Sequence, residues 1–370
     1  MPTQANEITL DRDALYYPYI HVFDANWLKA TLLCFPHVHR MVPFSFEIDD
    51  SEEIRSFQKM NGPRGEPLLI NEPMSNSVKI AQSELLSRIQ ANHEYIFEQY
   101  SFARAASEYG DMNLLFTIYS EKMVSDLLNY LVKERFAALY PSQYGDWIYV
   151  HPQLGKAIMS TIAISIANDK GLDIVTNRTE IHHQVLAATT EGVFEELVGL
   201  RKSASESDLS DKVDDLAEIV MHSFFDVSKL TAQNIADLLK DGKDLRRFKN
   251  ALIPIAKSIP AIENLDARDK RLKDASAEVI HEWEKYKKSL PRFALDAIFD
   301  ATEVKFPEIA SSIIAGASGT RLGIGSGLAI GLLTYSGIKI WRRFREQSTS
   351  PFQYLSRIEK YGATLTIPRA

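Results

Sequence analysis

The first part of the chain alternates between short apolar runs and amphipathic stretches. Residues 14–23 ("ALYYPYIHVF") are rich in aromatic and β-branched side chains and predict a strand, which Pro18 makes an edge or irregular one. Asp24 is a suitable N-cap for a helix over "ANWLKATLLCF", where apolar residues recur at helical spacing. The segment "HVHRMVPFSFEI" alternates and predicts a second strand. Residues 61–76 contain five glycines and prolines and predict a loop.

The alternation of predicted strands and helices continues toward the middle of the chain. Helical spacing predicts helices over residues 78–108 and over "SEKMVSDLLNYLVKERFAALY". The apolar segment "GKAIMSTIAISIANDKG" predicts a further helix that ends at Gly171. Strands are predicted at "NLLFTIY", "DWIYV" and "LDIVTN". This order of strands and helices predicts an α/β or α+β N-terminal half.

The second part of the chain has a different pattern. Residues 201–212 ("RKSASESDLSDK") are polar and serine-rich, which indicates a boundary or a loop. Beyond them, amphipathic segments such as "LTAQNIADLLKD", with Thr231 as N-cap, and "DLRRFKNALIPIAKSI" predict a mainly α-helical C-terminal half. We therefore expect two domains, an α/β or α+β domain over 1–205 and a helical domain over 206–370.

Composition narrows the class of protein. The 370 residues are 45% hydrophobic and 25% charged, which is ordinary for a globular chain. The net charge of −7 gives no reason to expect a nucleic-acid partner, and the basic run "RRFK" (246–249) is typical of a solvated helix face. The single cysteine, Cys34, fits a reducing compartment. The N-terminus lacks the pattern of a secretory signal, so we expect a cytoplasmic protein.

Glycine is concentrated near the C-terminus. Seven of the 17 glycines lie between residues 316 and 337. Four of them recur at every fourth position: Gly319, Gly323, Gly327 and Gly331. Each glycine costs a helix roughly 1 kcal/mol relative to alanine. On a helix this spacing makes a gently winding groove that lets another backbone approach closely, and it predicts helix-on-helix packing.

The same segment approaches the length of a membrane span. Residues 322–338 contain no ionisable group except Tyr335 and would rise roughly 26 Å as a helix, against a bilayer core of about 30 Å. Trp341, Arg342 and Arg343 follow, as in an interfacial anchor. Residues 309–320 are also uncharged, so 309–341 predicts a hairpin of two short apolar helices.

Three interpretations of this hairpin stay open. It is a buried helix pair in a soluble domain, a permanent span, or an element stored in a soluble fold and inserted on a trigger. The basic residues after it favour a cytoplasmic C-terminus, which speaks against a permanent span without an export signal. Conditional insertion implies membrane lipid as partner, and the glycine groove implies a second copy or another protein.

Candidate chemistry is sparse. His37 and His39 alternate on the predicted second strand and share a face, where two imidazoles could begin a metal or phosphate site. The segment "DATEVKF" (300–306) has the carboxylates and lysine of some metal-dependent nucleases, but its helical surroundings favour chance. No phosphate-binding loop or nucleophile elbow is present. We expect no cofactor and no catalytic residue, and a metal-dependent hydrolase or nuclease is the remaining enzymatic alternative.

Three short stretches carry a resemblance. "YYPYI" (16–20), "WLK" (27–29) and "GLDIVTN" (171–177) are similar to segments of an uncharacterised bacterial family. The resemblance implies a bacterial protein associated with defence against phage, and no catalytic residues. We expect an antiviral protein whose N-terminal half senses a trigger and whose segment 309–341 then acts on a membrane or in oligomer assembly. The alternative is a soluble interaction or regulatory protein with a buried helical hairpin.

Overall fold

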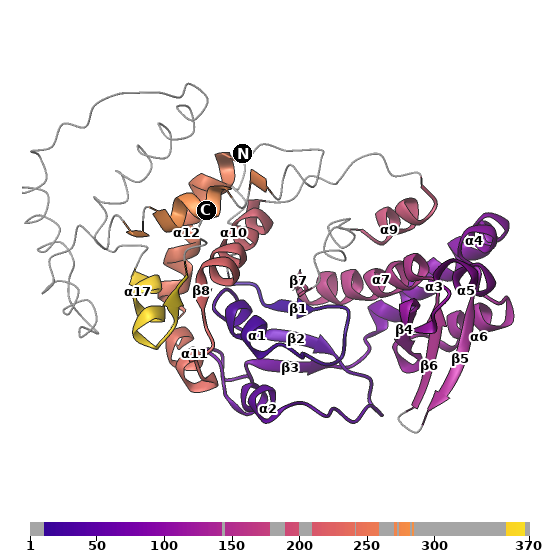
Figure 1. Ribbon diagram of the computed structural model, residues 1–370, viewed down its shortest axis with the longest axis horizontal. Helices are drawn as coiled ribbons and strands as arrows, with labels where there is room; N and C mark the ends of the chain where they lie inside the picture. The colour runs from indigo at the N-terminus through magenta and orange to yellow at the C-terminus, as the bar shows by residue number, and fades with distance from the viewer. Residues whose placement is uncertain are drawn as a thin grey trace, which may run out of the picture.

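The N-terminal half has an α/β fold built on a parallel sheet (Figure 1). The computed structural model describes residues 11–142, 145–177, 189–199, 209–240, 242–258, 270–271, 274–281, 283–284 and 353–366. The sheet has the strand order β3-β2-β1-β7. Its strands are β1 (Ala14–Tyr16), β2 (Val38–Met41), β3 (Leu69–Glu72) and β7 (Asp173–Val175).

The N-cap predicted for the first helix is confirmed, whereas the predicted strands over 14–23 and "HVHRMVPFSFEI" end earlier, at Tyr16 and Met41. Helix α1 (Ala25–Leu32) connects β1 to β2, and the Asp24 carboxylate accepts the backbone N–H groups of Asn26 and Trp27. Helix α2 (Glu52–Lys59) connects β2 to β3. The prediction of a loop throughout 61–76 is wrong, because β3 forms there by pairing with β2, with Leu69 opposite Val38.

The strand order reverses at the border between β1 and β7. The chain runs outward from β1 to β2 and β3, and returns through helix α7 (Pro152–Lys170) to place β7 on the other side of β1. Gly171 ends α7 in the left-handed conformation with φ of 66°, as its position predicted. In α/β sheets such a reversal is where ligands bind, outside the carboxyl ends of the strands.

A second sheet is antiparallel, in the order β4-β6-β5. Its strands are β4 (Phe116–Tyr119), β5 (Ala137–Ser142) and β6 (Gly145–Val150). Helices around it are α3 (Asn76–Ala91), α4 (His93–Tyr100), α5 (Phe102–Tyr109) and α6 (Ser125–Lys133), while α9 (Thr190–Leu197) packs against α7 and α3. The helix predicted over 120–140 ends at Lys133, because Arg135 adopts a φ of 62° and turns the chain into the β5–β6 hairpin.

Besides helical residues within 270–284, the described part of the C-terminal half contributes four further helices and a strand pair. These are α10 (Leu209–Phe224), β8 (Phe225–Asp226), α11 (Ala232–Leu239), α12 (Lys243–Ser258), α17 (Gln353–Lys360) and β9 (Thr364–Leu365). Thr231 caps α11 as predicted. A mainly helical C-terminal half stays a prediction, since much of it lies outside the described residues.

The parallel sheet separates two hydrophobic cores. Ala14 and Tyr16 face a first core that includes side chains of α1, α2, α10, α11, α12 and α17, whereas Leu15 and Tyr17 face a second core with α3, α7 and the antiparallel sheet. Helices from both sides of the predicted boundary at residues 205 and 206 therefore share the first core. The division into two domains stays a prediction.

Candidate functional site

The two predicted histidines are buried on the parallel sheet. His37 and His39 are 0% and 7% exposed. The Nδ1 atom of His37 lies 2.8 Å from the carbonyl oxygen of Pro67. Gly62 lies against the same ring, so that a Cβ at residue 62 would be 2.7 Å from the His37 Cε1 atom. A larger residue at 62 would displace His37.

His39 lies between two carboxylates. Its Nδ1 atom is 2.7 Å from Glu72 Oε1 and its Nε2 atom is 3.5 Å from Asp13 Oδ2. Lys170 Nζ lies 2.6 Å from the other oxygen of Glu72, and the Arg64 guanidinium pairs with Asp13. These five side chains, which we name the His39 network, alternate in charge from α7 to the β2–β3 connection.

The His39 network favours a doubly protonated imidazole. Burial alone lowers the pKa of His39, but the hydrogen bonds and charges of Asp13 and Glu72 outweigh it and raise the pKa. An imidazolium offers no lone pair to a metal ion. Among the described residues, no set of three His, Cys, Asp or Glu side chains is arranged to hold a metal ion. Metal or phosphate binding by His37 and His39 stays a prediction.

The His39 network predicts a pH dependence of stability. Because the pKa of His39 is raised in the folded state, its stabilisation is complete below the unfolded value of about 6.5 and is lost as pH rises through the folded value. We expect urea midpoints to fall with rising pH above that point, and His39→Gln to reduce the slope. His93→Gln is the control, since His93 lies outside the network and contacts Tyr130. An unchanged slope in His39→Gln would show that another group titrates.

Arg40 binds the loop after β1, the loop after β2 and strand β3 together at the carboxyl edge of the sheet. It is 0% exposed, and its guanidinium donates to both carboxylate oxygens of Asp50 at 2.9 and 2.5 Å. It also donates to Asn71 Oδ1 at 2.8 Å and to the Ile20 carbonyl at 3.2 Å. The loops that follow β1 and β2 are thereby tied to β3. Because Asp50 neutralises it, Arg40 has a structural role in this arrangement.

A second buried cation lies at this edge, and no carboxylate among the described residues forms an ion pair with it. Lys122 follows β4 and is 4% exposed, and its Nζ atom donates to the Pro18 carbonyl at 3.0 Å. Burial lowers the pKa of Lys122 to about 7. Nearby, Phe46 packs against Tyr119 and Trp147 and joins the edge to the antiparallel sheet.

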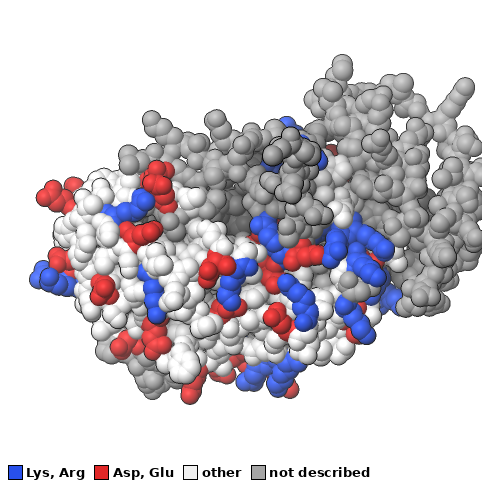
Figure 2. Space-filling model, turned by 180° about the vertical axis from the view of Figure 1, so that it is seen from behind, with Lys and Arg blue, Asp and Glu red and all other residues white. Residues whose placement is uncertain are grey.

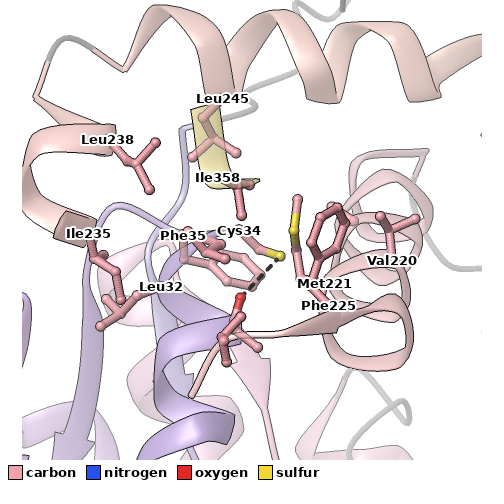
Figure 3. Packing of buried hydrophobic residues seen from close by; sticks show 14 of the residues in the cluster. Leu32, Cys34, Phe35, Val220, Met221, Phe225, Ile235, Leu238, Leu245 and Ile358 are labelled. Carbon is pink, nitrogen blue, oxygen red and sulfur yellow. Dashed lines mark hydrogen bonds between the residues drawn. The ribbon is translucent and has the colours of Figure 1, made fainter. Parts of the chain in front are cut away.

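The last described elements dock on the first core. We name α17 and β9 the C-terminal anchor. Tyr354, Leu355 and Ile358 of α17 are all 0% exposed. The Tyr354 hydroxyl donates to the Leu33 carbonyl at 2.7 Å, and β9 pairs with β8. Figure 3 shows Ile358 directed into the core that also contains Cys34, Phe35 and Leu245.

Helix α12 is held to the same core by charge as well as apolar packing. Lys249 is 0% exposed, and its Nζ atom lies 2.6 Å from Asp214 Oδ1 of α10 and 4.7 Å from the ring centroid of Phe35. Asp173 of β7 pairs with Arg12 at 2.8 Å, and burial together with the adjacent Asp214 raises its pKa. The prediction of a solvated face for residues 246–249 is therefore wrong at Lys249, because α12 turns this side chain toward α10.

The predicted packing and membrane residues cannot be placed. Gly319, Gly323, Gly327, Gly331, Trp341, Arg342 and Arg343 lie outside the described residues, as does the segment 300–306. None of the described helices combines the length and apolar character that a bilayer span requires. On the face shown in Figure 2, basic and acidic side chains of the described part are interspersed.

The sequence interpretation missed Lys122, Arg40 and Tyr354. Lys249 could have been found, since it adjoins Phe248 and follows Leu245 by four residues, which places it on the apolar side of α12. Lys122 lies in the polar run "SEKM" between a strand and a helix, where a lysine is ordinary. Nothing in the sequence around it indicates burial.

Comparison with known proteins adds no relative. No protein-family model, no curated protein and no solved structure matches this chain.

Proposed function

We propose that this chain is a bacterial antiviral effector in which the α/β half holds the apolar segment 309–341 until a trigger releases it. One observation carries the proposal. The first core contains residues on both sides of the segment, with Trp283 before it and Tyr354 of α17 after it, and helices α12 and α17 pack against each other. The α/β half thus holds the chain on both sides of the segment.

The composition of the segment supports a role in lipid or in assembly. Its glycines recur at every fourth position, and a helix of such composition is marginal in water without a partner. The groove favours packing against another helix, of this chain or of a second copy. The basic residues Arg342 and Arg343 beside Trp341 suit the surface of an anionic membrane.

The C-terminal anchor and helix α12, which attach the chain after and before the segment, differ in length and in their buried contacts. The C-terminal anchor has an eight-residue helix and a two-residue strand. Beyond its buried apolar side chains it is held by the Tyr354 hydroxyl and by ion pairing of Arg357 with Asp244 of α12. Helix α12 has 16 residues and the buried Lys249–Asp214 pair. We therefore expect the C-terminal anchor to open first, because its opening disrupts fewer buried contacts.

The glycine groove can be tested in infected cells. We expect expression of the chain in a bacterial host to lower phage plating efficiency at least about tenfold, and Gly323→Leu with Gly327→Leu to abolish that protection by closing the groove. Gly325→Leu with Ala329→Leu is the matched control, since at 100° per residue both positions lie on the side of the helix opposite the glycine row. Plaque counts and the soluble amount of each variant are the measurements.

Other outcomes contradict this function. Absence of protection by the wild-type chain against a broad phage panel would contradict the antiviral role. If the glycine pair makes the protein insoluble, the segment is a buried hairpin of a soluble regulatory protein. Metal-dependent cleavage of nucleic acid that is lost in His37→Ala would favour the enzymatic alternative instead.

A further inference from the structure

The carboxyl end of β1 borders the reversal of strand order. The Tyr17 N–H group donates to the Val175 carbonyl at 3.0 Å, so the ends of β1 and β7 lie side by side there. The Tyr16 hydroxyl lies 3.3 Å from Asn177 Oδ1 at the same end. In doubly wound sheets the ligand binds outside the carboxyl ends at this position, whichever chemistry the protein performs.

Lys122 differs from the other buried cations. Four lysine and arginine side chains of the described part are buried, and three of them have a carboxylate partner: Lys29 with Glu53 at 2.5 Å, Arg40 with Asp50 at 2.5 Å, and Lys249 with Asp214 at 2.6 Å. Lys122 donates a hydrogen bond to the Pro18 carbonyl, and within the described residues no carboxylate forms an ion pair with it. A buried ammonium without a counter-ion costs stability, and such costs concentrate at functional sites.

We propose that Lys122 is the counter-ion of a small anion bound at the carboxyl ends of β1 and β7. An anionic group near Pro18 would supply the negative charge that the described residues do not provide. The β2 side of the edge is less suitable, because Asp50 already neutralises Arg40 there and Asp49 adds a further negative charge near His21. The phosphate of a nucleotide and the carboxylate of an organic acid share this chemistry. Binding at Lys122 is independent of what segment 309–341 does.

The proposal implies a pH dependence of binding. Only the ammonium form of Lys122 attracts an anion, and burial brings the pKa of the free site to about 7. Above that pH the amine must take up a proton when the anion binds. Affinity should therefore fall by up to about tenfold for each pH unit above 7.

The test is calorimetric titration of the full chain with sulfate, ATP and citrate. Sulfate does not titrate between pH 7 and 8.5, so a change in its affinity reports on the protein. We expect at least one anion to bind, its affinity to fall about tenfold or more in Lys122→Met, and to fall again in the wild type at pH 8.5. Preference for ATP would assign the anion to phosphate, and preference for citrate would assign it to carboxylate.

Lys133→Met is the matched control, since that lysine is 82% exposed. Equal affinity in the wild type and in Lys122→Met would overturn the proposal, and so would absence of binding by all three anions at 10 mM, on the order of the weakest specific affinities. If Lys122→Met does not fold, Lys122→Gln replaces it. In that case a second result also overturns the proposal, namely that the wild type binds sulfate with the same affinity at pH 7 and at pH 8.5.

Discussion

Replacement of Tyr354 by alanine is expected to lower the free energy of opening of the C-terminal anchor by about 3–5 kcal/mol, the usual cost of truncating a fully buried aromatic side chain. Tyr354 is 0% exposed, and its ring lies 5.8 Å from that of Phe248 in α12. Its removal leaves a cavity between α12 and the end of α1. Hydrogen exchange of the amides of residues 353–365 is the measurement, because the anchor can open without unfolding the sheet.

Tyr354→Phe separates packing from hydrogen bonding. It keeps the ring and removes the bond to the Leu33 carbonyl, so we expect a loss of about 1 kcal/mol. If Tyr354→Ala changes exchange no more than Tyr354→Phe does, the ring does not hold the anchor and the docking of α17 on the first core is wrong.

Replacement of Lys249 by methionine is expected to lower the free energy of unfolding by about 3–5 kcal/mol, because breaking a buried ion pair leaves its partner charged and uncompensated. Asp214 would lose the ammonium at 2.6 Å, close to the buried carboxyl of Asp173. The cation–π contact with Phe35 would be lost as well. Urea unfolding followed by tryptophan fluorescence measures the effect.

A variant on the same helix and a double variant control this prediction. Lys257→Met changes an exposed lysine of α12 and should alter stability by less than about 0.5 kcal/mol. Adding Asp214→Asn to Lys249→Met should recover part of the loss, since it removes the orphaned charge. Equal stability of Lys249→Met and Lys257→Met would contradict a buried ion pair at this place.

The parts of the fold that were predicted correctly carry local signals. Asp24 and Thr231 are caps, Gly171 is a terminator, and apolar spacing marks α1 and α7. Strand β3 lacks such a signal, because its four residues adjoin glycines and prolines and it forms through pairing with β2. The sequence predicts a helix where β5 forms, because apolar spacing continues past Lys133 and only the backbone of Arg135 turns the chain.

The candidate site is harder to predict from the sequence than the fold, because the residues that contact His39 and Lys122 lie far from them in the chain. The alternation of His37 and His39 is local, but their partners Asp13 and Glu72 come from other segments and meet only when the sheet forms. Lys122 meets the Pro18 carbonyl across 104 residues. Burial of Lys122 is decided by tertiary packing, and the spacing around it does not reveal it, whereas Lys249 occupies a position on the apolar side of its helix.

Vesicle flotation of Tyr354→Ala tests most directly whether the α/β half restrains segment 309–341. We predict that the wild-type chain stays with the protein fraction, that Tyr354→Ala floats with anionic vesicles, and that Gly323→Leu with Gly327→Leu in the Tyr354→Ala background reduces flotation. Tyr354→Phe should behave like the wild type. If hydrogen exchange shows the anchor open in Tyr354→Ala and the protein still does not float, release of this segment onto a membrane is contradicted.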